Sequence, residues 1–302
     1  MNYYNSIHEL IGKTPIIKLN NLGVDKNVNL FAKLELWNPG GSVKDRIGEY
    51  MIKDAEKKGT LKKGGTIVDA TAGNTGIGIA LAALNKGYRV IFTVPEKFSQ
   101  EKLSLMKALG AKIVITPREE GMLGAGKKAK ELVSKIDGAI SLDQFKNPAN
   151  PLAHYETTGP EIYESLEGNI DYLVAGAGSG GTFSGIVKYL KEKKPDVKGI
   201  LVDPYGSTLG GGAEGPYNIE GIGNDFVADT MDMSLVDDVI KVSDDEAFSA
   251  SRLLMKKEGI LGGSSTGAAL FGALKLSKRI TSGNIVAVFP DRGDRYFSKG
   301  LF

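Results

Sequence analysis

Apolar, strand-like runs alternate with helical segments along nearly the whole chain, and this alternation constrains the fold more than any other feature. Some runs are continuously apolar, such as Ile285–Phe289, as expected for strands buried on both faces of a parallel sheet. Strands that alternate with helices predict an α/β protein with doubly wound, mainly parallel sheets. The length of 302 residues, 41% of them hydrophobic, is enough for two such domains.

The pattern predicts ten strands and eight helices. The expected strands are Thr14–Leu19, Asn29–Leu36, Thr66–Thr71, Arg89–Val94, Lys112–Pro117, Ala139–Gln144, Tyr172–Gly178, Lys198–Pro204, Val239–Asp244 and Asn284–Pro290. The expected helices are Val43–Lys58, Thr75–Asn85, Ser99–Leu109, Leu123–Ser134, Pro151–Ser165, Thr182–Lys193, Asp245–Glu258 and Thr266–Lys278. The segment Gly206–Asp229 is rich in glycine and weakly periodic, so we expect an irregular loop that lines a site.

Composition excludes several classes of function. The chain has no cysteine and only two histidines, which argues against disulfides, zinc–thiolate sites and most Ser-His-Asp chemistry, and we expect no metal site. The net charge of +2 gives no indication of nucleic acid or an anionic membrane as a partner. We find neither a signal-peptide pattern nor an apolar run of transmembrane length, so we expect a cytoplasmic protein.

Lys44 lies where a lysine has unusual chemistry. It follows the turn Asn38-Pro39-Gly40-Gly41 and Ser42, which is a good helix N-cap, so it falls in the first turn of an expected helix. The helix dipole disfavours a cation there and favours the neutral amine, which is the nucleophilic form. Alone, however, the segment favours a solvated surface lysine.

Two glycine-rich loops follow expected strands and open helices. Ala72-Gly73-Asn74-Thr75-Gly76 offers hydroxyl, amide and backbone donors at a helix N-terminus, which suits a carboxylate; an ordinary tight turn is an equal alternative. Gly176-Ala177-Gly178-Ser179-Gly180-Gly181-Thr182 is typical of a phosphate-binding loop. The same loop fits G-x-G-x-x-G, and Asp203 ends the next strand, so an NAD-dependent enzyme is a serious competitor.

Two further segments are weaker signals. Gly262-Gly263-Ser264-Ser265-Thr266-Gly267 also opens a helix, and a plain capped helix start explains it unless other residues place it in a site. Gly121–Lys128 does not fit a nucleotide P-loop, because Lys128 stands where Ser or Thr must hold magnesium. We interpret it as a solvated helix start.

Taken together, these segments resemble the fold-type II pyridoxal-phosphate (PLP) enzymes of the cysteine synthase and cystathionine β-synthase family. The resemblance runs nearly end to end and in order. It rests on Ile11–Pro15, Asn38–Arg46, Val94–Ser99, Lys107–Ala111, Gln144–Pro151, Thr157–Glu161, Glu220–Gly223 and Phe289–Tyr296. With this many segments in family order, the NAD alternative becomes distant.

The resemblance implies a role for each loop. Lys44 would bind the PLP aldehyde covalently and later act as general base. Gly178, Ser179, Gly180, Gly181 and Thr182 would hold the phosphate, Asn74 the ring hydroxyl, and Ser265 the pyridine nitrogen. A hydroxyl partner makes the ring a weaker electron sink, which favours elimination of a β leaving group over transamination. The implied substrate residues are Thr71, Ala72, Gly73, Asn74, Thr75 and Gln144 for the carboxylate, with Gly221, Asp225 and Asp232 lining the pocket.

The resemblance also implies a domain division and a homodimer. Residues 41–145 would form a smaller, mobile domain with the substrate loop, and residues 1–40 with 146–302 a larger domain with the phosphate loop. Two departures leave details open. Ala72 stands where common cysteine synthases have serine, and Gly221–Val227 resembles the cystathionine β-synthase loop more than the cysteine synthase loop.

The implied reaction is a β-replacement. O-acetylserine, serine or cysteine would lose its β substituent to give an α-aminoacrylate, and sulfide or a thiol amino acid would add at Cβ. Cysteine as first substrate would release hydrogen sulfide. The alternatives are a serine or threonine dehydratase and, from another class, a non-catalytic PLP-binding regulatory partner, against which the presence of Lys44 argues. For a thiol amino acid, Glu214, Asp225, Asp229 and Asp232 are candidate partners of its ammonium group, although each alone is more simply a solvated acid.

Overall fold

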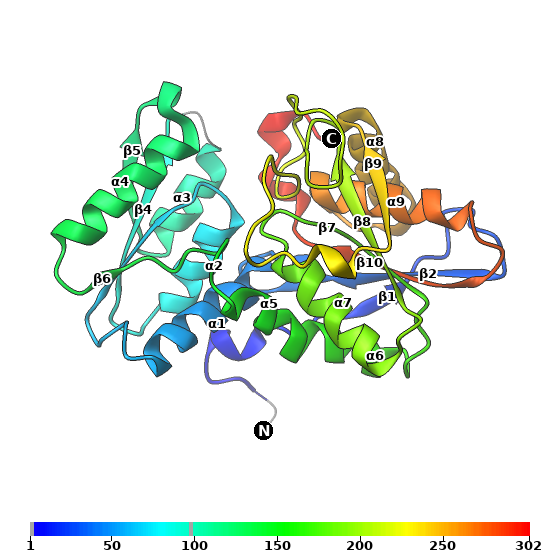
Figure 1. Ribbon diagram of the computed structural model, residues 1–302, viewed down its shortest axis with the longest axis horizontal. Helices are drawn as coiled ribbons and strands as arrows, with labels where there is room; N and C mark the ends of the chain where they lie inside the picture. The colour runs from blue at the N-terminus through cyan, green and yellow to red at the C-terminus, as the bar shows by residue number, and fades with distance from the viewer. Residues whose placement is uncertain (1–2, 97–98) are drawn as a thin grey trace. The chain divides into compact units, whose positions relative to one another are not determined.

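The computed structural model describes residues 3–96 and 99–302, and Figure 1 shows its helices and strands. The chain divides into two compact units. The first unit is Met1–Ile11 with Lys44–Asn150, and the second unit is Gly12–Val43 with Pro151–Phe302. Lys97 and Phe98, within the family-like segment Val94–Ser99, lie outside the described residues.

The first unit is built on a four-stranded parallel sheet in the order β5-β4-β3-β6. The strands are β3 (Thr66–Ala70), β4 (Arg89–Pro95), β5 (Lys112–Thr116) and β6 (Ala139–Ile140). The helices are α1 (Lys44–Lys57), α2 (Asn74–Ala83), α3 (Gln100–Ala108) and α4 (Gly121–Lys135), with short 3-10 turns at Ile7–Leu10 and Arg118–Glu120. Helix α4 packs against β3 and β4.

The second unit is built on a six-stranded sheet in the order β1-β2-β10-β7-β8-β9. The strands are β1 (Ile16–Lys18), β2 (Val28–Leu34), β7 (Tyr172–Gly176), β8 (Lys198–Pro204), β9 (Asp238–Val242) and β10 (Gly283–Phe289). The edge strand β1 pairs antiparallel with β2, and the other pairs are parallel. Its main helices are α6 (Gly159–Ser165), α7 (Gly181–Lys193), α8 (Asp244–Glu258) and α9 (Ser264–Ser277). Short 3-10 turns lie at Glu35–Trp37, Met233–Leu235, Gly293–Arg295 and Phe297–Lys299.

Strand β10 shows that the second unit is doubly wound. Ile285, Ala287 and Phe289 belong to one buried cluster, which α8 and α9 complete. Val286 and Val288 belong to a second cluster, completed by α7. Because successive side chains of a strand point to opposite faces, one apolar run serves two cores. The predicted α/β class with mainly parallel sheets is confirmed. The loop from residue 205 to 232, all of it described, contains no helix or strand, as expected.

Two predicted elements differ from the structure. The strand predicted over Ala139–Gln144 ends at Ile140, because the next three residues turn to bond the Asp69 side chain instead of a neighbouring strand. The helix predicted over Pro151–Ser165 is three segments: α5 (Ala149–Ala153), a π-helical turn (His154–Thr158) and α6. Pro160 has no N–H to donate to the preceding turn, which explains why the helix widens there.

Helices α1 and α2 cross at two glycines. A Cβ on Gly48 would lie 2.5 Å from the carbonyl carbon of Gly78, and a Cβ on Gly78 would overlap the carbonyl oxygen of Lys44. The backbones can approach this closely only because neither residue has a side chain. The crossing therefore fixes the start of α1, where Lys44 lies, against the second turn of α2.

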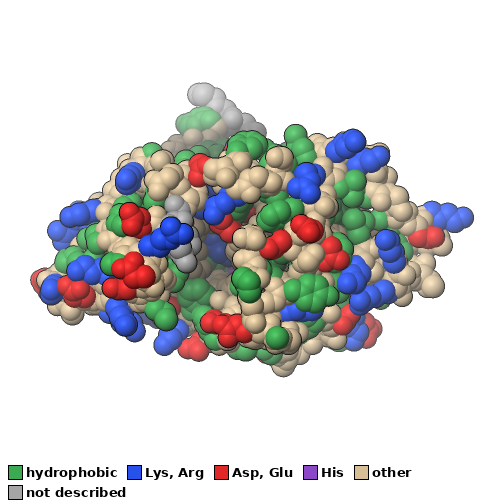
Figure 2. All heavy atoms as spheres, turned by 90° about the horizontal axis from the view of Figure 1, so that it is seen from above, with side chains coloured by type: hydrophobic (Ala, Val, Ile, Leu, Met, Phe, Trp, Pro, Cys, Tyr) green, Lys and Arg blue, Asp and Glu red, His purple; other side chains and the backbone are tan. Residues whose placement is uncertain are grey.

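Charged side chains of both signs are interspersed on the face seen in Figure 2, in keeping with the near balance of 38 basic and 36 acidic residues. Within residues 3–96 and 99–302, no helix has the length and apolar character needed to cross a bilayer. The same residues contain no group of three His, Cys, Asp or Glu arranged to hold a metal ion.

The glycine crossing generates the first prediction. Gly78→Ala should lower the free energy of unfolding by about 1–3 kcal/mol, because the new methyl group overlaps the Lys44 carbonyl. Gly126→Ala in α4 is the matched control: its Cβ would meet no atom within 4 Å, so helix propensity should raise stability by about 0.5–1 kcal/mol. Denaturant unfolding followed by far-UV circular dichroism measures both. Equal effects of the two variants would contradict a tight crossing.

Candidate functional site

Lys44 is the first residue of α1, and the loop before it is held by the second unit's own contacts. The Val43 amide donates to the Pro290 carbonyl over 2.8 Å, and the Arg295 guanidinium donates to the Gly40 carbonyl. Lys44 is partly buried, so it is not the solvated surface lysine that the segment alone allowed. Its backbone lies against Gly78, one helical turn from Asn74 at the start of α2.

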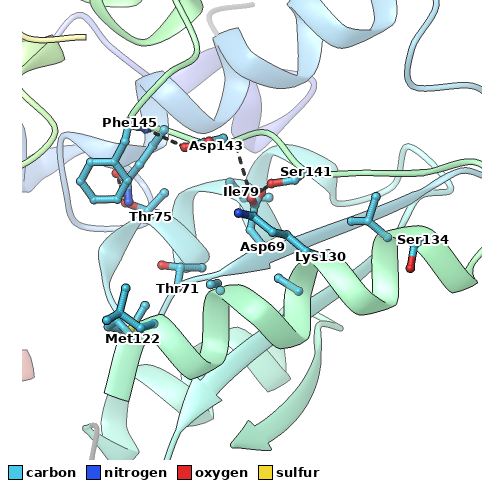
Figure 3. A pocket seen from close by; sticks show the side chains of 16 residues that line it. Asp69, Thr71, Thr75, Ile79, Met122, Lys130, Ser134, Ser141, Asp143 and Phe145 are labelled. Atoms are coloured by element: carbon cyan, nitrogen blue, oxygen red, sulfur yellow. Dashed lines mark hydrogen bonds between the residues drawn. The ribbon is translucent and has the colours of Figure 1, made fainter. Parts of the chain in front are cut away.

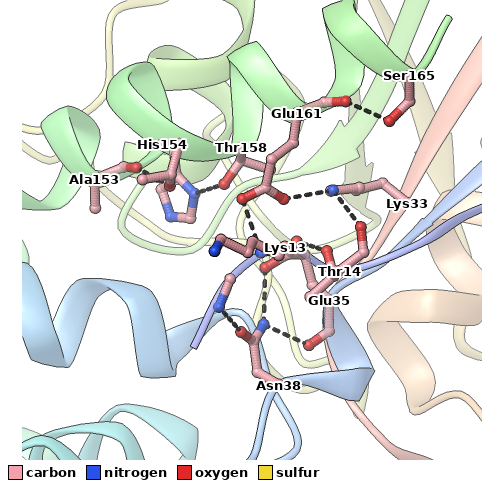
Figure 4. Close-up of polar contacts among 12 residues, drawn as sticks. Lys13, Thr14, Lys33, Glu35, Asn38, Ala153, His154, Thr158, Glu161 and Ser165 are labelled. Atoms are coloured by element: carbon pink, nitrogen blue, oxygen red, sulfur yellow. Dashed lines mark hydrogen bonds and ion pairs between the residues drawn. The ribbon is translucent and has the colours of Figure 1, made fainter. Parts of the chain in front are cut away.

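A buried polar network anchors the same loop from its other end (Figure 4). The Lys33 ammonium, fully buried, bonds the Thr14 carbonyl and a Glu161 carboxylate oxygen, each at 2.6 Å. Thr14 Oγ1 donates to Glu35 Oε1 over 2.6 Å, and Asn38 Nδ2 donates to Glu35 Oε2 over 2.9 Å. Asn38 is the first residue of the turn that leads to Lys44, so the network determines where this turn begins.

The predicted phosphate loop leads from β7 into α7, and its carbonyl groups are bonded within the second unit. The Ala177 carbonyl accepts from the Gly223 amide (2.8 Å) and the Gly178 carbonyl from Asn224 Nδ2 (2.6 Å). The Ser179 carbonyl accepts from Thr230 Oγ1 over 2.5 Å. The carbonyl groups of three consecutive residues therefore point toward the segment 223–230. The backbone N–H and hydroxyl donors of the loop are not used by these bonds.

The loop also has the shape of an anion cradle. A Cβ on Gly178 would lie 2.6 Å from the Gly221 carbonyl oxygen, and Gly180 has a left-handed backbone (φ 82°). Among the described residues no side chain caps the N-terminus of α7, whose dipole favours a negative charge. His154, fully buried, hydrogen-bonds the Thr182 hydroxyl over 3.1 Å and so holds its orientation. The donor set and the lack of space for a Cβ fit a phosphate group.

Ser265 lies near this cradle, with Gly221 between them. A Cβ on Gly221 would be 3.8 Å from Ser265 Oγ, an ordinary contact. Ser265 is buried in the first turn of α9, and its hydroxyl donates to Asp291 over 3.4 Å. Tyr296 donates to the other Asp291 oxygen over 2.5 Å, and burial beside this carboxylate raises the Tyr296 pKa well above 10. The predicted phosphate loop, Gly221 and Ser265 are thus brought together within one unit.

In the first unit, three of the six predicted carboxylate-binding residues line a cavity of about 430 Å³ between β3, α4 and the segment after β6 (Figure 3). Thr71, Thr75 and Gln144 contribute to its wall, and Thr75 Oγ1 donates to Gln144 Oε1 over 2.8 Å. Asn74 begins α2 beside them, after Ala72 and Gly73 in the turn. The structure therefore brings together two predicted segments about 70 residues apart in sequence.

Several cavity residues are absent from the sequence prediction. Met122 and Leu123 from α4 and Phe145 line the cavity, although Gly121–Lys128 was interpreted as a merely solvated helix start. Asp69, buried in β3, accepts bonds from Ser141, Leu142 and Asp143. Burial raises the pKa of Asp69 to about 6, against the lowering effect of those three bonds. The one available signal was a lone acid in an otherwise apolar strand.

The four acids of the irregular loop differ in their surroundings. Asp232 Oδ1 accepts from the amide and hydroxyl of Ser234, so it caps the short turn Met233–Leu235. Glu214, Asp225 and Asp229 are exposed. Tyr217, in the same loop, has a pKa raised above 10. The largest cause is its burial, and the negative charges of Asp203 and Asp225 add to it.

Asp203 removes the main support for an NAD site. Its fully buried carboxylate bonds the Lys241 ammonium (2.7 Å), the Ser207 hydroxyl (2.7 Å) and the Gly210 amide (2.9 Å). An acid occupied by three donors of its own chain is not available to the hydroxyls of a ribose. The G-x-G-x-x-G loop is therefore better explained by phosphate binding alone.

Comparisons with known proteins agree with this geometry. Residues 7–291 match the family described as pyridoxal-phosphate dependent enzyme. The chain is 51% identical over 303 residues to the O-acetylserine dependent cystathionine beta-synthase of Bacillus subtilis (strain 168), covering 100% of this chain and 99% of that protein. It is 47% identical over 305 residues to the cysteine synthase of Helicobacter pylori (strain ATCC 700392 / 26695), covering 100% of both.

A solved structure shows the same relation. The crystal structure of a hydrogen sulfide-producing enzyme from Fusobacterium nucleatum matches with a TM-score of 0.94 at 41% sequence identity, covering 98% of this chain and 99% of that one. The family match covers residues 7–291, and the two relatives near 50% identity align with the whole chain. The chain therefore belongs to the pyridoxal-phosphate-dependent enzymes, in the cysteine synthase and cystathionine β-synthase group that its sequence resembles.

Proposed function

We propose that this enzyme performs β-replacement on a β-substituted L-amino acid. O-acetylserine, serine or cysteine loses its β substituent, and sulfide or a thiol amino acid adds at the same carbon. The observation that carries the proposal is the full-length identity of 51% to a cystathionine β-synthase that depends on O-acetylserine. The hydroxyl of Ser265, in place of a carboxylate, is the local feature that favours elimination at Cβ.

The residues of the second unit would hold pyridoxal phosphate by its two ends. Gly178, Ser179, Gly180, Gly181 and Thr182 would bind the phosphate through backbone and hydroxyl donors, and Ser265 would face the pyridine nitrogen. When bound, the cofactor withdraws electrons from the substrate's Cα and so acidifies its proton. The Ser265 hydroxyl has one proton, which it donates to the buried Asp291 in the structure, so it would have to turn from Asp291 to the pyridine nitrogen when the cofactor binds.

The residues of the first unit would bind and deprotonate the amino acid. Lys44 would hold the cofactor covalently at rest and, once released, accept the α proton as general base. Asn74 would bond the cofactor's ring hydroxyl. Thr71, Asn74, Thr75 and Gln144, with the turn at Ala72 and Gly73, would bind the substrate carboxylate. Thr75 and Gln144 already form a matched donor and acceptor pair in the cavity.

Lys44→Ala tests the central assignment. Borohydride reduction of the wild-type protein should fix pyridoxal phosphate on Lys44, as located by mass spectrometry, and the variant should show neither this adduct nor turnover. Lys53→Ala, an exposed lysine on the same helix, is the matched control. Normal turnover by Lys44→Ala would contradict the proposal.

Product analysis separates the candidate reactions. The wild-type protein should be assayed with O-acetylserine, serine and cysteine, each alone and with sulfide or homocysteine. A thioether or cysteine product supports β-replacement, whereas a keto acid formed without any thiol identifies a dehydratase. Hydrogen sulfide release from cysteine would show an activity like that named for the Fusobacterium relative. No product from any pair would favour a non-catalytic binding partner.

The phosphate loop gives the next prediction. Gly178→Ala should weaken pyridoxal phosphate binding by at least about tenfold, because its methyl group would displace the loop from the Gly221 carbonyl. Gly215→Ala is the control, since its Cβ would meet the nearest atom, Gly206 Cα, at an ordinary 3.7 Å. Titration of the apoprotein, followed by cofactor absorbance, measures both dissociation constants. Equal constants would show that the loop does not bind the phosphate.

We further propose that an acid of the irregular loop binds the ammonium of a thiol amino acid. Of the two acids expected to line the pocket, Asp225 and Asp232, Asp225 is the stronger candidate, because the Asp232 side chain already caps the turn Met233–Leu235. Asp225→Asn should raise the KM for homocysteine at least about tenfold while the first half-reaction is unchanged, as expected for loss of one charge-assisted hydrogen bond. Asp232→Asn should mainly loosen the turn Met233–Leu235. Stopped-flow traces of each half-reaction decide between them, and an unchanged homocysteine KM in both variants would exclude these acids.

The resemblance further implies a homodimer and a cytoplasmic location. Light scattering of the purified protein tests the first, and cell fractionation the second.

A further inference from the structure

Asp69 has hydrogen-bonding partners that a strand residue does not usually have. It lies in β3, two residues before Thr71, and its side chain is only 8% exposed. Its carboxylate accepts from the Ser141 hydroxyl (2.6 Å), the Leu142 amide (3.2 Å) and the Asp143 amide (3.3 Å). Strand β6 ends at Ile140. For the next three residues the acceptor is the Asp69 side chain instead of the backbone of β3 (Figure 3).

The segment held by Asp69 makes a tight turn where it leads to Gln144. Asp143 has a left-handed backbone (φ 45°), which aspartate adopts more readily than most residues. Its Oδ1 accepts from the Phe145 amide (3.2 Å) and its own amide donates to Asp69, so the turn is held on both sides of Asp143. Gln144 comes next, and its side chain accepts from Thr75 over 2.8 Å. The direction of the Gln144 side chain therefore depends on the turn that Asp69 holds.

We propose that Asp69 is a positioning residue for substrate recognition: as a carboxylate it holds Ser141–Asp143 so that Gln144 meets Thr75, and protonation of Asp69 loosens this arrangement. The inference rests on the proposed function, in which Gln144 and Thr75 bind the substrate carboxylate. Asp69 touches neither substrate nor cofactor in this scheme. It acts through Gln144.

Protonation changes what Asp69 can accept. A neutral carboxyl group has one O–H donor and weaker acceptors, so it no longer satisfies three donors equally well. Burial brings the pKa of Asp69 to about 6, within the range of a kinetic experiment. Asp143 of the held segment opposes ionisation of Asp69, and Lys130 of α4 lines the same cavity. Free α-carboxyl groups titrate below about 4 and α-amino groups above about 7.5, outside this range.

The test is the KM for the first amino-acid substrate against pH, measured on the holoenzyme. In the wild type the KM should be constant above pH 7 and rise as pH falls through about 6. The reason is that Asp69 loses its hold on Ser141–Asp143 when its carboxylate takes up a proton. Asp69→Asn should raise the KM about tenfold at pH 7.5 and abolish this acidic rise, with kcat little changed. Asp137→Asn, an exposed acid just before β6, should behave as wild type.

A milder variant keeps the test valid if Asp69→Asn folds poorly. Ser141→Ala removes the hydroxyl bond, the strongest lowering influence on the Asp69 pKa, so the acidic rise in KM should begin at a higher pH. Hydrogen–deuterium exchange gives a second readout: the Leu142 and Asp143 amides should exchange faster in Asp69→Asn than in the wild type.

Three results would overturn the inference. The first is an Asp69→Asn variant that keeps the wild-type pH dependence of KM. The second is faster exchange of the Leu142 and Asp143 amides in Asp69→Asn with an unchanged KM, which would make Asp69 purely structural. The third is an unchanged KM in Gln144→Ala, which would refute the premise taken from the proposed function. A raised KM in Gln144→Ala together with a wild-type KM in Asp69→Asn would reject the inference alone.

Discussion

The ion pair between the fully buried Lys33 and the partly buried Glu161 is the constraint on which the turn before Lys44 depends. Removing Glu161 would take the ion-pair partner from an ammonium group in the interior, which is far more costly than the pair itself. Lys33 has no exposed surface, and a second of its three donors is used by the Thr14 carbonyl. Hydrogen bonds through Thr14, Glu35 and Asn38 connect this pair to the turn that precedes Lys44.

Buried carboxylates recur in this protein, and three of them bind donors of their own unit. Asp203 closes the end of β8, Asp69 holds the segment after β6, and Asp291 accepts from Ser265 and Tyr296. The proposed phosphate loop works the opposite way. It contains no lysine or arginine, and its carbonyls are bonded elsewhere. An anion there would be held by neutral donors and a helix dipole, which are positioned before the ligand arrives.

Features that local sequence determines were predictable. The glycine-rich turn after β7, the start of α7 and the helical position of Lys44 follow from glycine, serine and turn patterns a few residues long. Features that depend on distant partners were not. Asp203 looked like a ribose-binding acid because its partner Lys241 lies 38 residues away. Asp69 was missed, and β6 was predicted too long, because the bonds that end the strand join residues more than 70 positions apart.

The Thr75–Gln144 hydrogen bond sets a threshold for any ligand of this cavity. The site is not a set of idle donors, because the threonine hydroxyl already has an acceptor in the glutamine. A ligand must offer something better than an amide oxygen before this bond opens. Hydrogen bonds to a carboxylate are roughly twice as strong as those between neutral groups, whereas an ester or a primary amide would gain little from the exchange. In the proposed function, this bond would favour a free amino-acid carboxylate over the corresponding ester or amide.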